Sequence, residues 1–160
     1  QLKVGEAGEE LFAKYYREPL IKIPENYADF KVASTGKILE LKTDTYPMEK
    51  TPNFYIERWS DFHTKKPGSV WQSRPHGVEI LCYFYLNSNT YFEFTDLEKL
   101  EFTLDKLIEK KSYIIIRNKW GISHGYKVPR SSLEGQYSIH QLQPELPSSE
   151  VEGTPDILKS

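Results

Sequence analysis

An acid and an amine share one face of a predicted strand in the first third of the chain. Side chains of a strand alternate between its two faces, so Glu40 and Lys42 in the segment Lys37–Thr43 point to the same side, about 7 Å apart. Asp29 precedes them by the length of a hairpin. Two carboxylates and a lysine that meet at the end of a sheet suit a hard divalent cation and an anionic substrate. The alternative is an ordinary Glu–Lys pair on a solvated sheet face.

Hydrophobic periodicity and turn residues predict the elements that must position these side chains. We expect helices over Glu6–Arg17 and Leu97–Lys110, and strands over Ala28–Ala33, Lys37–Thr43, Asn53–Trp59, Ile80–Leu86, Tyr91–Thr95 and Ser112–Arg117. Residues 34–36 and 87–89 are turn-rich and predict two hairpins, and Asp96 can cap the second helix. Asp61–Gly77 and the segment after Gly121 are predicted to be loops. This order of elements indicates a mixed α+β domain with one central sheet.

The pattern around the acid–amine strand resembles a known nuclease signature. Asp29, ten intervening residues and then Glu40-Leu41-Lys42 resemble the D…(D/E)-x-K motif of the PD-(D/E)XK, or restriction-endonuclease-like, superfamily, with Ala28 in place of the motif's proline. Gly5–Leu11 resembles the G-x-x-x-E opening helix of that family. Residues 40–44, 53–57 and 67–71 resemble a group of phage-type nucleases and Holliday-junction-resolvase-like proteins. The resemblance implies an α-β-β-β-α-β core with a central mixed sheet flanked by helices.

The same resemblance implies a metal-dependent DNA endonuclease that hydrolyses phosphodiester bonds, with branched or junction DNA as an expected substrate. The catalytic residues that it implies are Glu9, Asp29, Glu40 and Lys42. The ligands implied for Mg²⁺, or for Mn²⁺ as a substitute, are Asp29, Glu40, the main-chain carbonyl of Leu41, and Glu9 as an outer or second-metal ligand. Lys42 would position the attacking water or stabilise charge that develops in the transition state. Glu10 would replace Glu9 if the helix were rotated, and Glu9 as a surface residue of the first helical turn is the open alternative.

A polar segment after the third predicted strand carries candidate contacts to DNA. The residues that we expect to contact DNA are Lys65, Lys66, Ser69, Trp71, Gln72, Arg74 and, from the third strand, Asn53. Lysine and arginine neutralise phosphates, hydroxyl and amide groups hydrogen-bond to them, and tryptophan stacks on bases. An ordinary solvated loop with a buried Trp71 explains the composition equally well, and Asn53 could equally form the polar edge of a packed strand.

Length and composition bound the domain organisation. The chain has 160 residues, of which 38% are hydrophobic, and this favours one domain over residues 1–143. We expect the acidic, proline-containing tail 144–160 to be a mobile or interacting arm. The tail carries a charge of −3 and the whole chain −2, so residues 1–143 carry +1 and nucleic-acid binding stays open. The single cysteine, Cys82, excludes an internal disulfide and fits a reducing compartment.

Several classes of protein are disfavoured. No apolar run approaches the roughly 20 residues that cross a bilayer, and no apolar segment follows Gln1, so we expect neither a membrane protein nor a signal peptide. A cytoplasmic location, in the host cell if the protein is viral, follows as an expectation. DNA is the expected partner, and the resemblance to resolvases suggests a homodimer. The alternatives are a catalytically silent DNA-binding or assembly module on the same fold, and a sequence-specific homing or restriction-type nuclease.

Overall fold

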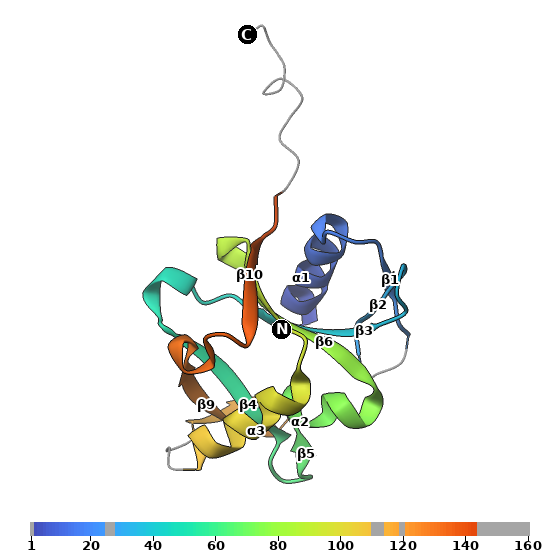
Figure 1. The fold of residues 1–160 in the computed structure, drawn as a ribbon. Helices are drawn as coiled ribbons and strands as arrows, with labels where there is room; N and C mark the ends of the chain where they lie inside the picture. Colours follow the sequence, from blue (N-terminus) through green and yellow to red (C-terminus); the bar gives the residue numbers. More distant parts are fainter. Residues whose placement is uncertain (1, 25–27, 110–113, 119–120, 144–160) are drawn as a thin grey trace, which may run out of the picture.

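Two β-sheets of unequal size organise the chain (Figure 1). The computed structural model describes residues 2–24, 28–109, 114–118 and 121–143. The larger sheet has the order β1 (Leu20–Lys22), β2 (Phe30–Val32), β3 (Ile38–Asp44), β6 (Val78–Tyr85), β7 (Thr90–Phe94) and β10 (Tyr137–Gln141). Its β3–β6 pair is parallel and its other pairs are antiparallel, so the central sheet is mixed. The smaller sheet is antiparallel, with the order β5 (Lys66–Pro67), β4 (Asn53–Asp61), β9 (Gly121–Pro129) and β8 (Ile114–Asn118).

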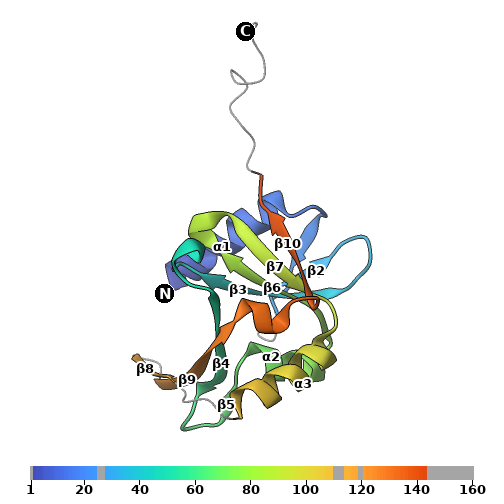
Figure 2. The ribbon, with the colours of Figure 1, turned by 60° about the vertical axis from the view of Figure 1, so that its left-hand side comes forward.

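Both faces of the larger sheet are buried, but by different elements (Figure 2). Helix α1 (Leu2–Tyr15) covers one face, where Phe12 packs against Leu39 and Leu41 of β3. The opposite face packs against α3 (Leu97–Ile108) and against β4, whose Phe54 is fully buried. Leu39 and Leu41 therefore serve one core while Glu40 and Lys42 face the side of the smaller sheet. This confirms the alternation predicted for β3.

The local signals in the sequence correspond to the observed turns and caps. The turn at residues 34–36 joins β2 to β3, and Gly36 adopts a φ of 77°, which favours glycine. Residues 86–89 join β6 to β7 in the second predicted hairpin. The side chain of Asp96 accepts a hydrogen bond from the Lys99 N–H at 3.1 Å and so caps α3 as predicted. Cys82 is fully buried in the core beneath α1.

The predicted α+β fold with a mixed central sheet is confirmed, but the chain also forms a second, smaller sheet that was not predicted. Strand β4 leaves the larger sheet and pairs with β9, because Phe54 and Ile56 bury their side chains against the face of that sheet instead of extending its edge. The segment after Gly121, which was predicted to be a loop, forms β9, a 3₁₀ turn and β10. Asp61–Gly77 is not a continuous loop either: it contains β5, the short helix α2 (Ser69–Ser73) and a 3₁₀ turn. Short β1 was not predicted.

Two predictions fall partly or wholly outside the described residues. The acidic tail 144–160 lies beyond them, and so does the start of the strand predicted at Ser112. Within the described part of the chain, no helix has the length and hydrophobicity needed to span a bilayer.

Candidate active site

Asp29 and Glu40 are held side by side by the β2–β3 hairpin. The Asp29 N–H donates to the Leu39 carbonyl at 3.2 Å, and Asp29 Oδ2 accepts the Leu41 N–H at 2.7 Å. The Asp29 side chain thus continues the pairing of β3 just before the first residue of β2. Glu40 lies between these two anchoring residues, and its carboxyl group is close enough to Asp29 for the Asp29 charge to raise the pKa of Glu40. Two carboxylates this close repel each other, so the pair tends to retain a proton.

Burial makes that proton easy to retain. Burial and then the charge of Asp29 raise the pKa of Glu40 from 4.5 to about 8, against the opposing effects of a Ser69 hydrogen bond and the Lys42 charge. Burial also raises the pKa of Asp29 to about 6, and the Leu41 N–H opposes the shift. Glu40 has the larger upward shift in pKa of the two, so the pair retains a proton more readily than exposed carboxyl groups do. The neighbouring lysines do not offset the burial and mutual repulsion of the two carboxyl groups. A divalent cation bound between them would do so.

Helix α1 brings Glu9 to this pair, as the family resemblance implied. A Cβ on Gly8 would lie 2.6 Å from Thr43 Oγ1, so only glycine lets α1 approach β3 this closely. Glu9 hydrogen-bonds to Asp29 and pairs with the ammonium group of Lys22 on β1. Glu10 is exposed on the outer side of the helix. The geometry thus selects Glu9 over Glu10, and it adds Lys22, which the sequence analysis did not single out.

Lys42 and Ser69 complete the cluster from two different elements. Lys42 lies one strand repeat beyond Glu40 on the same face of β3, close enough for its charge to lower the pKa of Glu40. Ser69 begins α2 and hydrogen-bonds to Glu40. The sequence predicts Ser69 to contact DNA, whereas in the structure it lies against a catalytic candidate. Its position in a segment predicted to be a loop gave no signal of this contact.

The side chains after Ser69 turn toward α3 instead of the carboxylates. Trp71 Nε1 donates to Asp105 at 2.8 Å, and the Arg74 guanidinium lies 3.4 Å from Glu101. The indole of Trp71 is partly buried against the core that contains Phe54. This agrees with the alternative that Trp71 packs inside the protein instead of contacting DNA. Gln72 is half-buried on the same helix.

The remaining predicted DNA contacts lie on the smaller sheet. Lys65 is exposed and its ammonium group lies 3.3 Å from the centre of the Phe62 ring, at the turn between β4 and β5. Lys66 is exposed on β5. Asn53 begins β4 and lines a cavity that extends from Lys42. Among these three, only Asn53 lines the same cavity as Lys42.

No protein-family model and no curated protein matches this chain. The evidence for its function is therefore the arrangement of Glu9, Asp29, Glu40 and Lys42.

The donor atoms of this cluster suit a hard cation. Asp29 and Glu40 supply carboxylate oxygens, and the Leu41 carbonyl leaves the strand on the same edge as its N–H, toward Asp29. Among the described residues, no three carboxylate, imidazole or thiol groups already surround a common point as ligands. Mg²⁺ usually takes only one or two carboxylates and keeps several waters, so the Asp29–Glu40 pair fits it.

The raised pKa of Glu40 predicts a pH-dependent gain in stability from Glu40→Gln. A folded-state pKa above the ordinary value favours the protonated form, so the stability contributed by protonated Glu40 is present below pH 4.5 and lost as the pH rises through about 8. Glutamine keeps the shape without the charge. At about pH 9 we expect the variant to have a higher melting temperature than the wild type, by about 2–4 °C for each kcal/mol of stability gained. At about pH 4 the two melting temperatures should be equal. Thermal melts across this range test it, and a difference independent of pH would contradict it.

Proposed function

We propose that the protein is a metal-dependent DNA endonuclease of the PD-(D/E)XK type. The observation that carries the proposal is the contact between the Asp29 and Glu40 carboxyl groups, with Glu9 beside them and Lys42 on the same strand face. Buried acids with raised pKa values concentrate at functional sites, because a structural role would be better served by neutral groups. An exposed Glu–Lys pair, the alternative from the sequence, would not place two further acids in contact with the pair.

The order of the elements supports the same assignment. With β4 and β5 set aside as an insertion, the chain runs α1, β1, β2, β3, α2 and β6, which has the α-β-β-β-α-β order that the resemblance implies. Strands β1, β2 and β3 form an antiparallel meander, and β6 runs parallel to β3. In this assignment β1 to β3 are the three strands of the core, and β4, which the sequence predicts as the third strand, belongs to the insertion.

Each residue of the cluster has a distinct role in the proposed reaction. Asp29, Glu40 and the Leu41 carbonyl would hold Mg²⁺, which supplies charge neutralisation at the scissile phosphate and a water of lowered pKa. Lys42 places a cation where negative charge grows as the phosphodiester bond breaks. Glu9 hydrogen-bonds to Asp29 and so orients it, while Lys22 limits the repulsion among the acids. Ser69, at the start of α2, would hold the Glu40 side chain in place.

A cleavage assay on linear, nicked and four-way DNA tests this function. We expect cleavage in Mg²⁺ or Mn²⁺ that EDTA abolishes, and Asp29→Asn should lower the rate by about 10²-fold or more, because it removes a charged ligand at the centre of the site. A thermal melt confirms that the variant is folded. The absence of cleavage on every substrate by folded wild-type protein would contradict the proposal, and DNA binding without cleavage would favour the silent binding module.

A further inference from the structure

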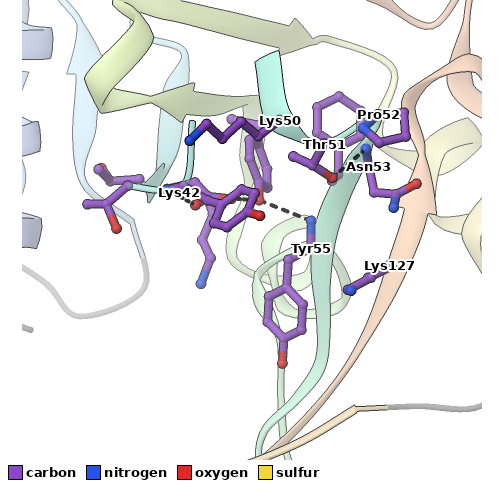
Figure 3. A pocket seen from close by; sticks show the side chains of 13 residues that line it. Lys42, Lys50, Thr51, Pro52, Asn53, Tyr55 and Lys127 are labelled. Carbon is purple, nitrogen blue, oxygen red and sulfur yellow. Dashed lines mark hydrogen bonds between the residues drawn. The ribbon is translucent and has the colours of Figure 1, made fainter. Parts of the chain in front are cut away.

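A cavity of about 620 Å³ extends from Lys42 into the space between the two sheets (Figure 3). Its walls come from the end of β3, the 3₁₀ turn η1 (Met48–Lys50), the start of β4, and β9. Sites for small organic ligands commonly measure about 300–1,000 Å³. The cavity is therefore large enough for one nucleotide unit, and it lies beside the proposed site of cleavage.

Three lysines give this cavity a surplus of positive charge. Lys42, Lys50 and Lys127 line it, and within the described part of the chain none of them forms a salt bridge. The one acid that lines it, Asp44, is already engaged, because its two oxygens accept hydrogen bonds from the Tyr46 N–H and the Tyr83 hydroxyl. Lysines that line one cavity and form no salt bridge favour an anionic ligand.

The other lining groups suit a base as well as a phosphate. Tyr46 is 55% exposed at the cavity, and in the view of Figure 3 Tyr55 lies between Lys42 and Lys127. Bases of single-stranded nucleic acid stack on such rings, while cations follow the backbone. The Asn53 side chain adds an amide that can hydrogen-bond to a base edge. A base inside a duplex must be unstacked and unpaired before it can enter a cavity of this kind, at a cost of a few kcal/mol, whereas a single-stranded nucleotide enters without that cost.

Lys42 links the cavity to the carboxylate cluster, because it lines the cavity and its charge acts on Glu40. The same lysine also lines a narrow hollow of about 20 Å³ together with Ser69, which hydrogen-bonds to Glu40. A phosphate held at Glu40 and Lys42 would thus have its neighbouring nucleotide directed toward the cavity.

We propose that this cavity binds one unpaired nucleotide next to the phosphate that is cleaved, so that the substrate is DNA with a single-stranded segment at the cleavage site. This inference rests on the proposed nuclease function and narrows its substrate class to flaps, splayed ends and junctions with unpaired bases. Fully paired duplex leaves the cavity unused.

The test compares one duplex sequence in two forms, fully paired and with a single-stranded flap of either polarity. Single-turnover cleavage rates in Mg²⁺ are measured for the wild type, for the double variant Tyr46→Ala with Lys127→Ala, and for Lys99→Ala. Tyr46 and Lys127 are exposed, so their loss should leave the fold intact, which a thermal melt checks. Lys99 is an exposed lysine on α3 that does not line the cavity, and it serves as the matched control.

We expect the wild type and Lys99→Ala to cleave one flap polarity at least about tenfold faster than the duplex, which is the effect of one stacked base. The double variant should bring that ratio close to one. Equal rates on flap and duplex, or a ratio that the double variant does not change, would overturn the inference while the nuclease function stands. No cleavage of either form would overturn both.

Discussion

Replacing Lys42 by alanine is expected to lower the single-turnover rate of DNA cleavage by about 10²-fold or more. The ammonium group lies on the same face of β3 as Glu40 and acts on the charge of that carboxyl group, so it is placed to act on charge that develops at the scissile phosphate. The affinity for DNA should change little, because Lys42 is one of several cations near the cavity. Rates at saturating enzyme and binding by fluorescence anisotropy separate the two effects.

Two controls distinguish chemistry from binding. Lys42→Arg should not restore the full rate, because a guanidinium is longer and planar and cannot take the position of the ammonium beside Glu40. Lys65→Ala with Lys66→Ala should do the reverse of Lys42→Ala: it should weaken binding, reduce the salt dependence by up to about two units of slope, and leave the saturated rate close to normal. Cleavage by Lys42→Ala at the wild-type rate would remove the catalytic role of β3.

Gly68→Ala is expected to destabilise the protein by about 3 kcal/mol or more. A Cβ at this position would lie 1.7 Å from the carbonyl oxygen of Glu57 and 2.7 Å from its carbonyl carbon. Both atoms belong to the backbone of β4, so neither can rotate away, and the start of α2 must move off β4. That movement would also carry Ser69 away from Glu40. Urea denaturation measures the loss of stability, and the cleavage rate of the folded fraction measures the effect on the site.

Gly5→Ala is the matched control for this prediction. A Cβ on Gly5 would meet no atom within 4 Å, and alanine favours a helix over glycine by roughly 1 kcal/mol. The same chemical change should therefore be neutral or slightly stabilising in α1. If Gly68→Ala were equally well tolerated, the close packing of α2 on β4 would not be a requirement of the fold.

The sequence alone was enough to predict the strand that carries Glu40 and Lys42. The alternation of Leu39 and Leu41 with Glu40 and Lys42 is a local property of β3, since one face of the strand must be buried and the other need not be. The turn at residues 34–36 and the Asp96 cap are equally local, because each depends on the backbone preferences of a few neighbouring residues. These local patterns can be recognised in the sequence without any knowledge of the rest of the chain.

The partners of that strand were decided by tertiary packing. The sequence could not show that β4 would join a second sheet, because burial of Phe54 against the core competes with pairing along the sheet edge and the outcome depends on distant residues. The same competition governs the segment after Gly121: it pairs with β4 as β9 and so brings Lys127 to the cavity. Ser69 reaches Glu40 only because Gly68 lets α2 touch β4. Local sequence thus determined which residues can do chemistry, whereas long-range contacts decided which of them meet, because pairing energies between distant segments are not encoded in either segment alone.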